Sequence, residues 1–332
     1  MRQIVDSEGK LNYGALVEWY PWIIETGRKC ILSPDSDGLL CGLLMQHFLD
    51  WDIVGFYDGK VLVLKEGLKT SDCVFLDMEI FRSFTKSIGQ HMLMWNAKKD
   101  IEKPEWANFD NCISPNNIRK FDGKTKFSKK YPLGTIHMLL GIVNTVKYVD
   151  IKKEAICPLL YTDGTFKNMF NYPENVLDWL SFLSAEDKSS PLYQVFFDNS
   201  YSTSALMLAL KEFFAKIQEI SGGSRGGDKI QISNKEGHSI NMIQNSRNLF
   251  DLNERQVEIG TRFLNLLSEL TGWGYLPDKW CFCDFIVYNF SKGQIVPNGR
   301  NFDALISQQP ISWAMTAGNR IEYTIESTDK LD

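Results

Sequence analysis

Histidine is scarce in this chain, and long apolar runs are absent. The 332 residues include only four histidines, so a metal site would have to rest mostly on carboxylates. No run of about 18 consecutive apolar residues occurs, and Asp6 and Glu8 lie where a signal peptide needs apolar residues. We therefore expect no membrane span and a cytoplasmic location.

Cysteine sets that could bind zinc are also missing. The seven cysteines are an odd number, and Cys281 and Cys283 are the only two that lie close together in the sequence. A zinc site would need two more thiols or imidazoles near this pair, and the sequence offers none. We interpret the cysteines as core thiols of a protein in a reducing compartment.

Neither sign of charge is in large excess. Lysine and arginine number 36 against 41 aspartates and glutamates, which gives a net charge of -5. This excludes a generic polycation that coats nucleic acid, although a local basic patch could still bind one. Carboxylates gathered in one pocket bind hard cations, so the placement of the acidic residues matters more than their number.

The first half of the chain alternates short apolar runs with helical segments, which is the pattern of an α/β fold. The expected strands cover residues 28–33, 52–57, 61–64 and 73–76, and the expected helices 38–49 and 133–146. Long helices at 202–220 and 254–270 precede a late strand-rich region. We expect a mostly parallel sheet flanked by helices, with a second, smaller α+β domain. Residues 1–184 would form the first domain, 185–200 a linker and 201–332 the second domain.

The clearest local signal is Ser33-Pro34-Asp35-Ser36-Asp37-Gly38, between an expected strand and an expected helix. Ligands of open α/β sheets bind at the carboxyl ends of strands, and both carboxylates could point into one pocket there. Charges this close repel each other unless a cation lies between them, and the adjacent helix N-terminus favours a phosphate oxygen. A purely structural alternative is that Asp35 caps the helix and Asp37 is a solvated acid of its first turn.

Two further aspartates follow apolar runs. Asp77 ends the expected strand 73–76, and Asp163 ends the run 155–161. Acids at the ends of several parallel strands converge on one edge of a sheet, so we expect Asp35, Asp37, Asp77 and Asp163 to share a site. Four carboxylates there would be costly without a metal, and with two divalent ions they would suit in-line attack on phosphorus.

The order of these motifs resembles that of the DHH phosphoesterase superfamily, which includes RecJ-type exonucleases and oligoribonuclease-like enzymes. The resemblance covers about residues 28–180 and rests on Asp35-Ser36-Asp37-Gly38, Asp77, Ile88-Gly89-Gln90-His91 and Asp163-Gly164-Thr165-Phe166. It implies that Asp35, Asp37, Asp77 and Asp163 bind one or two Mn²⁺ or Mg²⁺ ions, with His91 as a further catalytic ligand or phosphate contact. The implied activity is hydrolysis of a nucleotide or a short single-stranded nucleic acid.

The chain departs from the family pattern in its imidazoles. Ile31, Leu32 and Ser33 occupy the stretch where the family has a metal-binding histidine, and of the signature Asp-His-His only His91 remains. This lowers the expected affinity for manganese and favours a second hypothesis, a non-catalytic nucleotide- or nucleic-acid-binding module of a larger assembly. A third hypothesis is a haloacid-dehalogenase-type phosphatase with Asp35 as nucleophile and Asp37 as general acid. A homodimer is also compatible with the sequence.

Two segments are candidates for substrate binding. Residues 116–130 carry six basic residues against one acid, with aromatic rings between them, a combination that suits single strands. Residues 221–227 are rich in glycine, and consecutive backbone N–H groups beside an arginine suit a phosphate or carboxylate. A solubilising lysine loop and an interdomain hinge are the structural alternatives. The residues proposed to contact substrate are Lys126, Lys130, Gly222, Gly223, Arg225 and Gly226.

Overall fold

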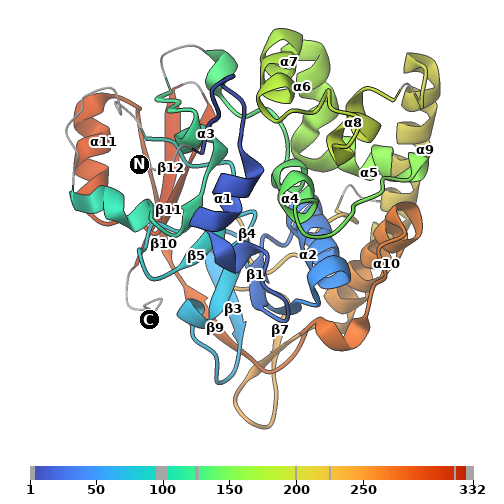
Figure 1. Cartoon of the computed structure of the whole chain (residues 1–332). Coiled ribbons are helices and arrows are strands. Elements are labelled where there is room, and N and C mark those ends of the chain that lie inside the picture. Colours follow the sequence, from blue (N-terminus) through green and yellow to red (C-terminus); the bar gives the residue numbers. More distant parts are fainter. Residues whose placement is uncertain are drawn as a thin grey trace.

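The computed structural model describes residues 4–94, 104–123, 127–198, 200–223, 226–317 and 319–326. Within them the chain forms a large mixed sheet flanked by helices and a second, smaller sheet (Figure 1). The predicted α/β class is therefore confirmed.

The large sheet has nine strands among the described residues, in the order β6-β5-β4-β1-β2-β3-β9-β8-β7. Neighbouring strands are parallel from β6 to β2 and antiparallel from β2 to β7, so a mostly parallel sheet is not confirmed. Since only residues 58–60 join β2 to β3, no crossover fits between them and the pair must be antiparallel. The strands are β1 (Lys29–Leu32), β2 (Asp52–Tyr57), β3 (Val61–Lys65), β4 (Cys73–Leu76), β5 (Lys86–Ile88), β6 (Cys112–Ile113), β7 (Met242–Gln244), β8 (Phe250–Leu252) and β9 (Phe285–Asn289).

Helix α2 (Ser36–Leu49) lies at the centre of the helical layer. It is apolar on nearly every side, because it packs on β1, β2 and β4 and is also in contact with α4 and α10. None of the described helices combines the length and the hydropathy needed to cross a membrane. The others are α1 (Tyr13–Trp19), α3 (Pro115–Ile118), α4 (Thr135–Val143), α5 (Ile156–Tyr161), α6 (Thr165–Asn171), α7 (Pro173–Phe182), α8 (Pro191–Phe196), α9 (Thr203–Ser221), α10 (Glu254–Thr271) and α11 (Gly299–Ile306).

The smaller sheet is antiparallel, in the order β10 (Ser291–Ile295), β12 (Arg320–Ile325), β11 (Ser312–Ala317). Phe302 of α11 and Trp313 of β11 pack in one apolar cluster with Phe81, which follows β4. The indole N–H of Trp313 also donates to the carbonyl of Leu93 at 2.9 Å. The smaller sheet is thereby held against the loops that follow β4 and β5.

The expected linker, residues 185–200, contains helix α8, and Ala185 and Leu192 there are fully buried. Strand β9, from the expected second domain, pairs with β3 of the expected first domain. The large sheet therefore crosses the expected boundary. The division into 1–184 and 201–332 stays a prediction.

The seven cysteines are all free. Five are buried, as expected of core thiols, but Cys281 is half-buried and Cys283 is exposed. The interpretation as a core thiol is wrong for Cys283, because the two residues lie just before β9 rather than inside a strand.

His137 in α4 should make one contribution to stability that is lost in mild acid. The ring is fully buried against Phe196, and burial lowers its pKa to about 4. The unfolded chain, with a histidine pKa of about 6.5, binds a proton that the folded chain does not, so stability is full above this pH and is lost as pH falls toward 4. Between pH 7 and pH 5 the histidine should cost about 2 kcal/mol. Urea unfolding at pH 7 and pH 5 should show that the change in stability is about 2 kcal/mol less favourable in the unmodified protein than in His137→Leu, and an equal change in both proteins would contradict the assignment.

Candidate metal centre

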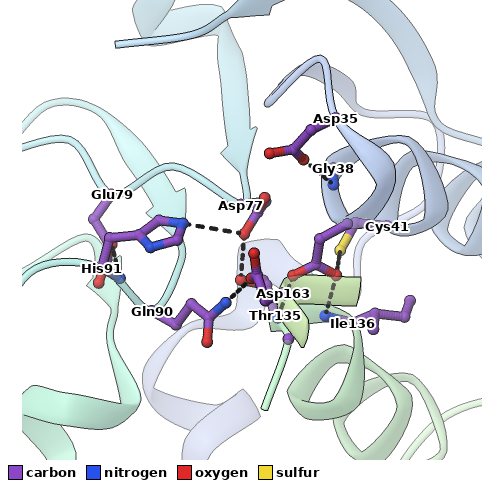
Figure 2. A network of polar contacts seen from close by, with 12 residues as sticks. Asp35, Gly38, Cys41, Asp77, Glu79, Gln90, His91, Thr135, Ile136 and Asp163 are labelled. Carbon is purple, nitrogen blue, oxygen red and sulfur yellow. Dashed lines mark hydrogen bonds and ion pairs between the residues drawn. The ribbon is translucent and has the colours of Figure 1, made fainter. Parts of the chain in front are cut away.

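Three adjacent parallel strands deliver acidic and imidazole side chains to one edge of the large sheet. Asp35 and Asp37 follow β1, Asp77 follows β4 directly, and His91 follows β5 by three residues. Their convergence at the carboxyl ends of the strands agrees with the arrangement expected from the sequence. Figure 2 shows His91, Asp77 and Asp163 facing one another from three separate segments of the chain.

Asp77, His91 and Asp163 are close enough to share one ion. One ligand atom from each lies within 4.8 Å of the others. His91 Nε2 is 3.8 Å from Asp77 Oδ1, and the side-chain amide of Gln90 donates to Asp163 Oδ2. We call these three residues the metal triad.

Asp77 has the least satisfied carboxylate of the site. It is fully buried, and Oδ1 accepts from the hydroxyl of Thr135 at 2.7 Å, but Oδ2 has no hydrogen-bond partner. Burial raises the pKa of Asp77 well above its usual range, and the charges of Asp37, Asp163 and Asp35 add to the shift. A buried oxygen without a partner is costly, and a cation at Oδ2 would remove the cost.

Asp37 faces the N-terminus of α4. Its carboxylate is fully buried and accepts from the backbone N–H groups of Thr135 at 2.6 Å and Ile136 at 3.2 Å. The expectation of a solvated acid is therefore wrong for Asp37. Burial, followed by the charges of Asp163 and Asp35, raises its pKa well above the usual range, although the N–H groups favour the ionised form.

Asp35 caps α2, since its Oδ1 accepts from the backbone N–H of Gly38 at 3.3 Å. It is half-buried and lies outside the metal triad. The capping role that was the structural alternative is therefore present. Its negative charge still raises the pKa of Asp37 and of Asp77, so it belongs to the same electrostatic cluster.

The expectation that Asp163 ends a strand is wrong. Residues 156–161 form helix α5, and Asp163 lies in the turn between α5 and α6, with a left-handed φ of 47°. A short apolar run does not distinguish a buried strand from a buried helix. Asp163 still reaches the site because the turn that holds it packs against α2.

Three residues of the site were missed from the sequence: Thr135, Gln90 and Glu79. Thr135 and Gln90 orient Asp77 and Asp163 through the hydrogen bonds given above. Glu79 is buried, and its Oε2 accepts from the backbone N–H groups of His91 at 2.8 Å and Met92 at 3.1 Å, which fixes the loop that presents His91. The position of Glu79 two residues after Asp77 is a signal that could have pointed to it.

Two cavities meet at Asp163. The larger, of about 650 Å³, runs from Asp35 and Asp163 to Phe214 of α9, and we call it the α9 cavity. The smaller, of about 200 Å³, lies on the side of Gln90 and His91 and is lined by Lys130. A phosphate ester bound at the metal triad would therefore have space for a substituent on either side.

Most of the predicted substrate contacts do not reach these cavities. The N–H groups of Gly222 and Gly223 donate to the last carbonyls of α9, so this stretch is a helix cap and the prediction of a phosphate nest is wrong for both glycines. Gly226 does not line either cavity. Lys126 and Arg225 lie outside the described residues. Of the four predicted contacts that the structure describes, Lys130 alone lines one of the two cavities, and burial lowers the pKa of its ammonium group.

The basic segment 116–130 is in part structural. Arg119 pairs with Asp178 at 2.7 Å and stacks on the ring of Trp179. Phe121 and Tyr131, expected to stack on bases, are buried in the apolar core. Of the described part of this segment, Lys130 is therefore the best candidate for contact with a ligand.

The residues of the metal triad suit a divalent cation. Carboxylate oxygens bind Mg²⁺ and Mn²⁺, and the imidazole of His91 favours Mn²⁺ of the two. No protein-family model matches this chain, and neither the curated proteins nor the solved structures contain a match. The resemblance to the DHH superfamily therefore stays a prediction.

Proposed function

We propose that this protein is a divalent-metal-dependent phosphoesterase, related to the DHH superfamily, that hydrolyses a nucleotide or a short single-stranded nucleic acid. The observation that carries the proposal is the buried carboxylate of Asp77, which ends a strand of the parallel part of the sheet. Its Oδ2 has no hydrogen-bond partner, its Oδ1 lies 3.8 Å from Nε2 of His91, and Asp163 completes the cluster. A carboxylate in this state calls for a cation, and the two cavities that meet at Asp163 offer space for a substrate.

Asp77, His91 and Asp163 would hold the ion, with Mn²⁺ favoured over Mg²⁺. Such an ion neutralises the charge that develops on phosphoryl oxygens and acidifies water. Thr135 and Gln90 orient the two carboxylates, and Lys130 is positioned to contact a phosphoryl oxygen from the smaller cavity. Asp35 and Asp37 add negative charge that favours a second cation.

The test is Mn²⁺-dependent release of phosphate or mononucleotide from a panel of nucleotides and short oligonucleotides. Asp163→Asn should lower the rate by about a thousandfold or more, because it removes the charge of one ligand while keeping the shape of the side chain. Asp198→Asn, an exposed residue beyond α8, is the matched control and should keep the full rate. Turnover that does not need metal, or that survives in Asp163→Asn, would contradict the proposal.

A second candidate function is a binding module without catalysis. It is favoured by Asp37, whose carboxylate is already satisfied by two backbone N–H groups and needs no ion. It predicts that nucleotides bind in EDTA and that no member of the panel is hydrolysed.

Beryllofluoride bound to Asp35 would instead support a haloacid-dehalogenase-type phosphatase. A cytoplasmic location and a homodimer or larger assembly stay predictions.

A further inference from the structure

We propose that the α9 cavity binds the nucleoside part of the substrate, with Asp228 as the residue that selects it. The inference deepens the proposed function and rests on it for the position of the phosphate. Asp228 directly follows the glycine-rich segment 221–227 but was not itself among the predicted substrate contacts. The wall of the cavity combines a rigidly held carboxylate, aromatic rings and two lysines.

Asp228 is held in place from two directions. Ile230, two residues later, donates its backbone N–H to the carbonyl of Pro34 at 2.8 Å, which ties this segment to the loop that carries Asp35. On the other side, Gly227 packs so closely on α9 that a Cβ there would lie 2.0 Å from the carbonyl oxygen of Ile217. The segment 227–230 is therefore fixed between the aspartate cluster and α9.

The carboxylate of Asp228 has one oxygen that is satisfied and one that is not. Oδ2 accepts from the hydroxyl of Tyr161 at 2.7 Å. Oδ1 is buried and has no hydrogen-bond partner, although Asp228 lines the cavity. A buried acceptor in this state is suited to a ligand that brings an N–H or O–H donor. Both a ribose hydroxyl and an amino group of a base supply one.

The remaining wall suits a flat ring and a phosphate. Tyr161 and Phe166 both pack against Phe214, with ring centroids 5.6 Å and 6.1 Å from it, and all three line the cavity. Lys167 and Lys229 line it as well, and both are exposed enough to reach a phosphate. Aromatic rings, a directed acceptor and two lysines in the wall of one cavity together match a nucleotide. The volume of about 650 Å³ suits one nucleotide rather than a long strand.

Calorimetry with adenosine in EDTA tests the nucleoside contact without the metal. Asp228→Asn should weaken binding by about tenfold or more, since Tyr161 holds the amide oxygen and the amide NH₂ then faces the donor of the ligand. Glu219→Gln, on the same helix α9 but outside the cavity, removes an equal charge and should bind as the unmodified protein does. Comparison with 2′-deoxyadenosine and with purine riboside identifies the donor as the ribose or the base.

AMP in the presence of Mn²⁺ separates the two parts of the site. Lys167→Ala should weaken AMP severalfold more than adenosine, because the ammonium group would contact the phosphate, whereas for the nucleoside the substitution removes only the cation that lies over the ring of Phe166. Unchanged adenosine and AMP affinities in Asp228→Asn would overturn the inference. Loss of adenosine binding in that variant with no turnover by the unmodified protein would support the nucleoside cavity and refute the phosphoesterase. If Asp228→Asn still turns over substrate with an unchanged KM, the phosphoesterase is supported and the nucleoside cavity is refuted.

Discussion

Asp77→Asn is expected to make the metal-free protein more stable and to abolish its response to divalent metal. The carboxylate is fully buried, one of its oxygens has no partner, and burial with three neighbouring carboxylates raises its pKa. Asparagine has nearly the same shape, carries no charge, and tolerates the left-handed backbone that Asp77 adopts at φ 61°. Near neutral pH, removal of this ionisable group should stabilise the metal-free fold by about 1–3 kcal/mol.

Urea unfolding in EDTA and in Mn²⁺ measures both effects. The unmodified protein should gain about 2.7 kcal/mol when the metal is at a hundred times its Kd, whereas Asp77→Asn should gain little at the same concentration. Asp50→Asn is the matched control, because Asp50 also has a left-handed backbone, at φ 58°, but its side chain is exposed. Its stability should change by no more than about 1 kcal/mol, through the surface ion pair with Lys279. An Asp77→Asn protein that is less stable in EDTA and still responds to Mn²⁺ would show that Asp77 is not a ligand.

The parts of the fold that were predicted correctly are those fixed by local patterns. The runs at 28–33, 52–57, 61–64 and 73–76 are strands because they are apolar, short and bounded by turn residues. Helix α2 was recognisable because it is apolar on all sides. The pairing of β9 with β3 was not predicted, since it joins residues more than 200 positions apart and no local pattern encodes it.

The candidate site divides in the same way. Asp35, Asp37 and Asp77 could be placed together because they follow β1 and β4. These two strands are adjacent and parallel, so their carboxyl ends lie at the same edge of the sheet. Thr135 acts only through its contact with Asp77, which is distant in sequence, so nothing in its neighbours marks it. Gln90 lies beside His91 in a motif already noted, but its contact with Asp163 joins distant residues and could not be read from that motif. Gly222 and Gly223 were misinterpreted because a glycine pair after a long helix has a simpler role, which is to end it.

The net charge of -5 does not reveal that four of the aspartates are clustered at one site. Asp35, Asp37, Asp77 and Asp163 lie close enough for their charges to act on one another, and the burial of Asp37 and Asp77 strengthens the repulsion. The backbone N–H groups at the start of α4 relieve this repulsion only for Asp37. Asp77 has no such backbone donors to offset the repulsion from its neighbours. A cation bound at Asp77 would therefore contribute most to stability.

Gly38→Ala should damage both the fold and the site. A Cβ at Gly38 would lie 2.0 Å from the carbonyl oxygen of Ser33 and 2.8 Å from its carbon, and these backbone atoms cannot turn aside as a side chain would. The end of β1 and the start of α2 would have to separate, which moves Asp35 and Asp37 with them. We expect a loss of about 2–3 kcal/mol, which outweighs the gain of about 1 kcal/mol that alanine normally gives in a helix.

Gly14→Ala provides the matched control for this substitution. Gly14 is also in the first turn of a helix, but its Cβ would approach only the side chain of Asn12, at 3.3 Å. Its stability should be unchanged or should rise by up to about 1 kcal/mol. Urea unfolding measures the difference between the two variants, and Mn²⁺ titration of the folded Gly38→Ala protein should show weakened binding. If Gly38→Ala instead unfolds and binds Mn²⁺ as Gly14→Ala does, then the close approach of α2 to β1 does not hold the aspartates in place.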